Sequence, residues 1–185
     1  MLQGKSKNCS LQRNELIEKY GDKVGFMKTF SPDYQFRICG DTDACLFGDY
    51  PTLSQMKTCY GANTPIAWLM PQLYNLSEFC GCKDKLEGNP LKECAFTIAT
   101  DFFYLKISEL MLFFHRFKSG RYGRFYGSVD PLVIMTALRE FVIERNESIA
   151  RHEQEEREKR VNEDREGAIT YEEYKKMKEH YEERR

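Results

Sequence analysis

Residues 117–131 combine cationic, aromatic and glycine residues in a pattern that favours contact with nucleic acid. The segment reads FKSGRYGRFYGSVDP and holds three glycines, three cations and four aromatic rings. Cations neutralise phosphates, and aromatic rings stack on unpaired bases for roughly 1–3 kcal/mol per base. Over residues 105–126, five cations oppose one anion, which leaves a local net charge of +4. We call residues 116–131 the hinge, and we expect its contacts with nucleic acid to come from Arg116, Lys118, Arg121, Tyr122, Arg124 and Tyr126.

Two other interpretations of the hinge stay open. It could be a structural corner, because Gly120 stands where a helix that ends near Ser119 favours a left-handed residue. Phe117, Tyr122 and Phe125 would then cover the end of the core, and the arginines would pair with acidic residues of the C-terminal tail. Contact with another protein is the third interpretation.

The sequence contains no recognised arrangement for catalysis. A Walker loop is excluded because Lys118 and Ser119 come before Gly120, after a segment expected to be helical. His115 could act as a base, but a lone histidine in an apolar central helix is expected to be a packed or hydrogen-bonded core residue. No Ser/His/Asp, Cys/His or paired-carboxylate set stands out, so we expect a non-enzymatic protein with no catalytic residues and no cofactor.

The seven cysteines are irregularly spaced, which is typical of reduced thiols. Zinc sites favour cysteine pairs with two to four other residues between them. Neither Cys39 with Cys45 nor Cys80 with Cys82 has that spacing. We therefore expect no metal, although a composite site built from all four stays open.

Composition favours a cytoplasmic protein without a membrane partner. The chain has 185 residues and a formal net charge of -1, so contact with nucleic acid would need a local patch. No apolar run is long enough to cross a bilayer, and no cationic start leads into an apolar secretory segment.

Helical periodicity predicts a helical core domain over residues 51–146. The best-defined segment is central, with apolar residues on most of its faces between Ile107 and Phe117. Pro71 is expected to kink or split the helix that contains it. The domain should hold five helices, which begin near Thr52, Thr64, Pro90, Ile107 and Pro131. Their expected core positions include Phe79, Phe103 and Leu132.

The segments on either side of this domain are less regular. Residues 1–50 are expected to form an irregular N-terminal arm with one short helix, and a short strand or hairpin between residues 23 and 50 is open. Residues 147–185 should form a charged helical tail, with a helix stop at Gly167 and a capping box that begins at Thr170.

Four stretches carry a resemblance to a known family. They are GDYPTLSQMKTCYG, AWLMPQLYNLSEFCGCKDKL, LKISELMLFFHRFKSGRYGRFYGSVDP and ALREFVIERN. Together they resemble an uncharacterised protein family of Bacteroides-type gut bacteria, their phages and integrated mobile elements. The resemblance covers about residues 48–146 and implies an accessory of DNA replication, such as a helicase loader, with no catalytic residue to transfer.

The sequence therefore predicts a mainly α protein, with a compact domain of about five helices, an irregular N-terminal arm and a charged helical C-terminal tail. Its expected function is that of a DNA-binding replication or maintenance accessory of a phage or mobile element, acting through the hinge. Candidate partners are nucleic acid and a replication protein such as a helicase. The alternative is a protein-binding adaptor that uses the tail, with a purely structural hinge.

Overall fold

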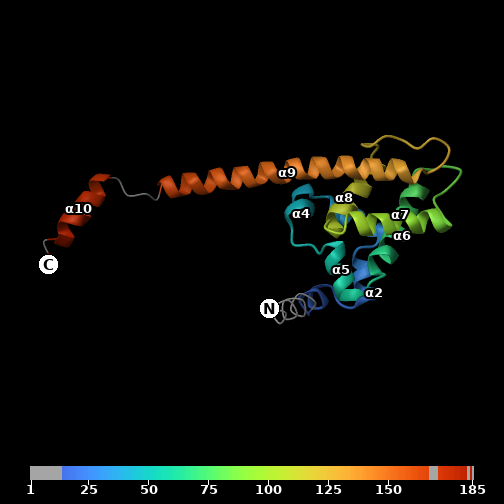
Figure 1. Cartoon of the computed structure of the whole chain (residues 1–185), viewed down its shortest axis with the longest axis horizontal. Coiled ribbons are helices and arrows are strands. Elements are labelled where there is room, and N and C mark those ends of the chain that lie inside the picture. Colours follow the sequence, from blue (N-terminus) through green and yellow to red (C-terminus); the bar gives the residue numbers. More distant parts are fainter. Residues whose placement is uncertain (1–13, 167–170, 183, 185) are drawn as a thin grey trace. The chain divides into compact units, whose positions relative to one another are not determined.

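The computed structural model describes residues 14–166, 171–182 and 184, in which every regular element is a helix (Figure 1). The mainly α fold is thereby confirmed. The chain divides into two compact units, Met1–Arg145 and Asn146–Arg185, which we describe separately. The helices are α2 (Lys23–Thr29), the short 3-10 helix η1 (Pro32–Tyr34), α3 (Gln35–Cys39), α4 (Thr42–Phe47), α5 (Leu53–Tyr60), α6 (Thr64–Phe79), α7 (Gly88–Asp101), α8 (Ile107–Lys118), α9 (Pro131–Glu166) and α10 (Tyr171–Glu182). Residues 14–20 are also helical and end at Gly21, whose φ is 77°.

Helix α5 begins and ends as its capping residues predict. The Thr52 side chain accepts a hydrogen bond from the Gln55 backbone amide at 3.2 Å, and the Gln55 side chain accepts one from the Thr52 amide at 2.8 Å. This reciprocal capping box satisfies two amides that the first turn would otherwise leave unpaired. Gly61 ends the helix with a φ of 107°.

Helix α6 is continuous through Pro71, so the helix is not split. Proline removes one intrahelical hydrogen bond, but the helix continues for eight residues beyond it to Phe79. The ring of Pro71 lies on the exposed side, while Leu69 and Leu73 lie in the core. Packing of these flanking leucines stabilises both halves of the helix.

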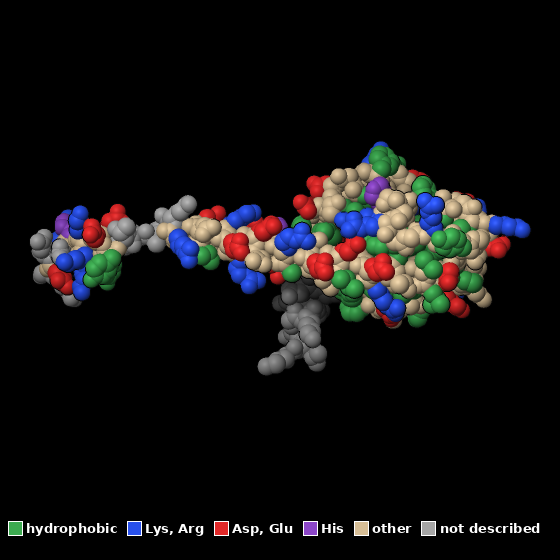
Figure 2. Space-filling view, turned by 90° about the horizontal axis from the view of Figure 1, so that it is seen from above, with side chains coloured by type: hydrophobic (Ala, Val, Ile, Leu, Met, Phe, Trp, Pro, Cys, Tyr) green, Lys and Arg blue, Asp and Glu red, His purple; other side chains and the backbone are tan. Residues whose placement is uncertain are grey.

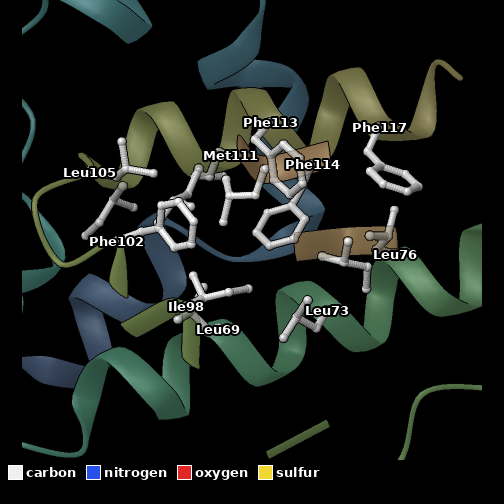
Figure 3. Close-up of a cluster of buried hydrophobic side chains, with 14 of the residues drawn as sticks. Leu69, Leu73, Leu76, Ile98, Phe102, Leu105, Met111, Phe113, Phe114 and Phe117 are labelled. Atoms are coloured by element: carbon white, nitrogen blue, oxygen red, sulfur yellow. The ribbon is translucent and has the colours of Figure 1, made fainter. Parts of the chain in front are cut away.

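Helix α8 is the centre of the first unit, as its apolar sequence predicts. It packs against α3, α4 and α6, and its residues from Ile107 to Phe114 are all buried. Figure 3 shows its aromatic side chains meeting leucines of α6 and the end of α7. The labelled core residues are Leu69, Leu73, Leu76, Ile98, Phe102, Leu105, Met111, Phe113, Phe114 and Phe117.

Residues 23–50 form short helices and no strand or hairpin, which corrects the expectation for this segment. Phe26 and Phe30 are buried, and their ring centroids lie 4.9 Å apart. The Trp68 indole and the Gln72 amide both donate to the Phe30 carbonyl at 2.8 Å. This part of the chain is therefore packed into the core of the first unit.

Hydrogen bonds from α8 hold the end of the same segment. The Lys106 ammonium donates to the carbonyls of Leu46 and Gly48 at 3.0 and 2.9 Å. The Ser108 hydroxyl donates to the Cys45 carbonyl at 2.8 Å. These bonds satisfy backbone carbonyls at the end of α4, where a helix leaves them unpaired.

Four side chains expected in the core are exposed instead. Phe79, Phe103 and Leu132 lie at or just beyond a helix end, and they are 63%, 54% and 73% exposed. His115 is exposed on α8, so it is not the packed core residue that we expected. The periodic pattern predicts a face of a helix but not how far the neighbouring helices extend over it.

The second unit contains the distal part of α9 and all of α10. Figure 2 shows Lys, Arg, Asp and Glu side chains interspersed along the distal part of α9. Gly167 and Thr170, the expected stop and cap, lie outside the described residues. None of the helices described above is long and apolar enough to cross a membrane.

Candidate nucleic-acid interface

The hinge is a tight connection between α8 and α9, within the first unit. Helix α8 ends at Lys118, and three glycines follow at Gly120, Gly123 and Gly127, with φ angles of 84°, 95° and 81°. These left-handed angles favour glycine over every other residue. The Asp130 side chain then accepts a hydrogen bond from the Leu132 amide at 2.8 Å and so caps α9.

The second half of the hinge pairs with the loop before α7. The Val129 amide donates to the Asp84 carbonyl at 3.2 Å, and Asp84 forms a parallel bridge with Ser128. Val129 is buried. The hinge is therefore held at both ends, by α8 and by this loop.

Three rings of the hinge cover the end of the core. Phe125 stacks on Phe117 with centroids 5.1 Å apart, and Tyr122 packs on Phe113 at 5.7 Å. Phe117 is buried and Phe125 is half-buried. These contacts agree with the structural interpretation of the rings.

One carboxylate of α9 binds three of the six predicted site residues. Glu144 accepts hydrogen bonds from the Arg116 guanidinium at 3.3 Å, from Arg121 at 3.1 Å and from the Tyr122 hydroxyl at 3.2 Å. Burial raises the pKa of Tyr122 to about 12, and the negative charge of Glu144 adds to the effect. Within the first unit, Glu144 therefore offsets part of the positive charge of the hinge.

Lys118 points away from the exposed side of the hinge. Its ammonium donates to the side-chain oxygens of Gln35, at 2.8 Å, and of Asn75. Gln35 in turn donates to Gln72 at 2.8 Å, and Gln72 donates to the Phe30 carbonyl. Burial lowers the pKa of Lys118. This chain of hydrogen bonds joins α8 to α3 and α6, so Lys118 has a structural partner in the first unit.

The other predicted site residues face solvent. Tyr126 is 91% exposed, and Arg124, two residues before it in the chain, is exposed as well. Among the described residues, neither side chain makes a hydrogen bond, ion pair or ring contact. Arg121 belongs partly to each class, because its side chain is bonded to Glu144 and is still 52% exposed. The structure thus separates the six residues into an inner set that binds the protein and an outer set of Arg124, Tyr126 and part of Arg121.

Sequence reasoning missed Glu144, although a signal for it exists. The buried stripe of α9 runs through Ile134, Leu138 and Phe141, and the next positions on that stripe are Glu144 and Arg145. A charged residue that continues a buried stripe needs a partner of opposite charge. Glu144 binds the hinge arginines, and Arg145 donates to the fully buried Glu109 at 2.7 Å.

The composite cysteine site does not assemble. Cys39 and Cys45 share a hydrogen bond, which raises the pKa of Cys39, and both are buried. Residues 14–166, which include all four cysteines, contain no group of three or more His, Cys, Asp or Glu side chains that could hold a metal ion.

Comparison with known proteins gives one match. A family model described as a family of unknown function (DUF6633) matches residues 85–185, which include α7, α8, the hinge, α9 and α10. No curated protein and no solved structure matches the chain.

Proposed function

We propose that the chain, which belongs to the DUF6633 family of unknown function, is a non-enzymatic accessory protein that contacts single-stranded nucleic acid through the outer part of its hinge. The biological setting that we propose is DNA replication or maintenance in a phage or mobile element of Bacteroides-type bacteria, and hence the cytoplasm. The sequence resemblance over about residues 48–146 supports that setting.

The observation that carries the proposal is the exposure of Tyr126 next to Arg124. A tyrosine that is 91% exposed contributes nothing to the core, and the corner between α8 and α9 does not require it. The glycines explain the turn, and Phe117, Tyr122 and Phe125 cover the core. These structural roles do not account for the side chains of Arg124 and Tyr126.

The chemistry of the outer hinge suits an unpaired strand better than a duplex. An exposed ring can stack on a base only where the base is not already stacked within a helix. Arg124 and the exposed part of Arg121 can neutralise neighbouring phosphates. The left-handed Gly123 and Gly127 have open space where a side chain would stand, so a strand can approach their backbone closely.

The proposal is tested by fluorescence anisotropy with labelled single-stranded and double-stranded oligonucleotides over a salt series. We expect salt-sensitive binding in the micromolar range, tighter for the single strand. The double variant Arg124→Gln with Tyr126→Leu should weaken binding by about tenfold or more, because it removes one phosphate contact and one stacking ring. Arg121 is left unchanged, since replacing it would also remove its bond to Glu144.

A matched control separates the hinge from general surface charge. Lys92 and Phe96 are an exposed cation and an exposed ring on α7. Their double variant, Lys92→Gln with Phe96→Leu, should bind oligonucleotides like the unchanged protein. Equal affinity of the two double variants, or no binding at low salt, would remove the hinge from consideration.

A second candidate function, a protein-binding adaptor, is supported by α10. Tyr171, Tyr174, Met177 and Tyr181 are 80%, 53%, 63% and 80% exposed, and their spacing puts them on one side of the helix. A helix with such a stripe fits an apolar groove of a partner. The partner that we propose is a replication protein such as a helicase.

The adaptor is tested by capture of a purified replicative helicase on the immobilised protein. Replacing Tyr174 and Met177 by Ser should abolish capture if the stripe makes the contact. The matched variant changes Glu172 and Lys176, which are exposed on the same helix, to Ser and should leave capture unchanged. Unchanged capture with the Tyr174 and Met177 variant would exclude the stripe as the binding surface.

A further inference from the structure

The first unit contains an open cleft that neither the hinge nor the tail explains. It lies among α2, η1, α3 and residues 48–50, and its volume is about 760 Å³. Small-molecule sites in proteins usually occupy roughly 300–1,000 Å³. The cleft shares no lining residue with the hinge.

Aromatic rings form one part of the cleft. Tyr20, Phe30, Tyr34 and Tyr50 line it. The Phe30 ring lies 5.2 Å from that of Tyr20 and 6.2 Å from that of Tyr50, measured between centroids. Phe30 is buried, and Tyr20 and Tyr50 are half-buried. A planar ligand ring can therefore pack against aromatic surface that the fold already holds in place.

Cations form the other part of the cleft, and two of them lack an anionic partner among the described residues. Lys19, Lys28 and Arg37 line the cleft together with the single carboxylate of Asp49, which pairs with Lys19 at 3.0 Å. Within the described chain, Lys28 makes no ion pair, and the Arg37 guanidinium lies 4.5 Å from the centre of the Tyr34 ring instead of against a carboxylate. Two positive charges thus remain available to an anion at one cleft.

The backbone around the cleft is firmly held. The Phe30 carbonyl accepts hydrogen bonds from Trp68 and Gln72, both at 2.8 Å. Gly48 is packed so tightly that an added Cβ would lie 2.3 Å from the Ala44 carbonyl oxygen and 3.0 Å from the Tyr50 ring. A site with fixed walls loses less conformational entropy when it binds a ligand.

We propose that this cleft binds a free nucleoside phosphate. The base packs against the rings of Tyr34 and Tyr50, which the buried Phe30 ring supports from the core side, and the phosphates lie against Lys28 and Arg37. A ligand without a ring would leave the aromatic surface unused, and a ligand without an anion would leave both cations unpaired. The cleft residues are separate from Arg124 and Tyr126, so this inference does not depend on the proposed function.

The test is isothermal titration calorimetry of the full-length protein with ATP, adenosine and inorganic tripolyphosphate. We expect ATP to bind, and adenosine and tripolyphosphate each to bind at least about tenfold more weakly, because each keeps only half of the contacts. Lys28→Ala and Arg37→Ala should each weaken ATP binding by several-fold. The double variant should weaken it by about tenfold or more.

Controls make each outcome decisive. Lys92→Ala, which removes an exposed cation of α7, should bind ATP like the unchanged protein, and so should the Arg124→Gln, Tyr126→Leu protein. Lys28 is exposed at the end of α2, so Lys28→Ala tests the cleft even if the Arg37 variant unfolds. Absence of ATP binding, or equal binding by the Lys28 and Lys92 variants, would overturn the proposal. An oligonucleotide that displaces ATP and binds the cleft more tightly would overturn its assignment to a free nucleotide.

Discussion

At the scale of single residues, Glu144 holds two of the hinge cations, Arg116 and Arg121, against the protein. Its two carboxylate oxygens accept hydrogen bonds from Arg116, Arg121 and Tyr122. The Arg116 side chain is 19% exposed and that of Glu144 is 31% exposed, so water screens this pair only partly. The same carboxylate thus stabilises the hinge and competes with any phosphate for its arginines.

Glu144→Gln should lower the free energy of unfolding by about 1–2 kcal/mol, since it removes the charge that two arginines share. The ion pair of Arg121 with Glu144 contributes little to this free energy, because half of the Arg121 side chain faces solvent. Urea unfolding measures the change. Glu140→Gln is the matched control, because Glu140 is exposed on α9 and makes no ion pair among the described residues. An equal loss of stability in both variants would contradict the role of Glu144.

The raised pKa of Tyr122 predicts that the stability of the folded protein falls with pH in the alkaline range. Its pKa is raised from 10.0 to about 12 in the folded protein, mainly by burial. The unfolded chain releases this proton at lower pH than the folded protein does. The contribution of Tyr122 to stability is therefore complete below about pH 10 and is lost as the pH rises through about 12.

Urea unfolding between these pH values should give a shallower fall in stability for Tyr122→Phe than for the unchanged protein. Burial also raises the pKa of Tyr20 and Tyr60, so the unchanged protein keeps part of its slope through those residues. Tyr126→Phe is the matched control, because Tyr126 is exposed, and it should leave the slope unchanged. Identical slopes for Tyr122→Phe and Tyr126→Phe would contradict the effect of burial.

At the scale of elements, the connection from α4 to α5 leaves no room for a side chain at Gly48. Gly48 has a φ of −63°, which any residue adopts, so its backbone conformation does not require glycine. The lack of space does require glycine, because a Cβ at this position would lie 2.3 Å from the Ala44 carbonyl oxygen. The turn that leads into α5 therefore depends on the absence of one side chain.

Gly48→Ala should destabilise the protein by roughly 1–3 kcal/mol, because the backbone must shift to admit the methyl group. Gly40→Ala is the matched control, with a φ of −65° and a nearest contact of 3.5 Å for the added Cβ. That change should be neutral or stabilise by about 0.4–1 kcal/mol through the unfolded state. Thermal or urea unfolding compares them, and equal effects would contradict the argument from space.

The elements also explain how much of the fold the sequence could predict. Helices α5 to α9 each show an apolar stripe over two or more turns, and their starts were predicted closely. Capping side chains form hydrogen bonds at α5 and α9, whereas the N-cap residues of α6 and α7 make no such bond. Helices α2, α3 and α4 have seven, five and six residues, which is too short for a 3.6-residue period to stand out. Their positions depend on distant partners, such as the bonds from Trp68 and Gln72 to Phe30.

The candidate site was predictable to a similar extent. The glycine turns and the covering rings follow from local sequence. The bond from Arg121 to Glu144 spans 23 residues and that from Lys118 to Gln35 spans 83. Composition gives no signal for such pairs, so the sequence could not separate the inner cations of the hinge from the outer ones.

At the scale of the whole molecule, the first unit has its own core, and the last residues of that core are in the first turns of α9. Ile134, Leu138 and Phe141 are buried, and Arg145 pairs with the buried Glu109. The described residues from 153 onward contribute no buried side chain. Folding of the first unit should therefore not depend on them.

Deleting residues 153–185 should change the melting temperature of the remaining protein by no more than about 3 °C. Differential scanning calorimetry measures it, with the full-length chain as reference. The deletion should also leave binding to the outer hinge unchanged, which separates the hinge from the adaptor function of α10. A fall of ten degrees or so would show that the stability of the first unit depends on residues 153–185.

The bonds from the hinge arginines to Glu144 affect how many ions are released when a nucleic acid strand binds the hinge. Small anions of the buffer gather mainly around cations that lack a fixed opposite charge, and in the hinge that means Arg124 and part of Arg121. A strand that binds there displaces these few anions and, for each of its phosphates that is neutralised, also releases about 0.7 of a cation from its own counterion layer. The affinity should therefore fall with salt as if one or two phosphates were bound, although the surrounding sequence carries a net charge of +4.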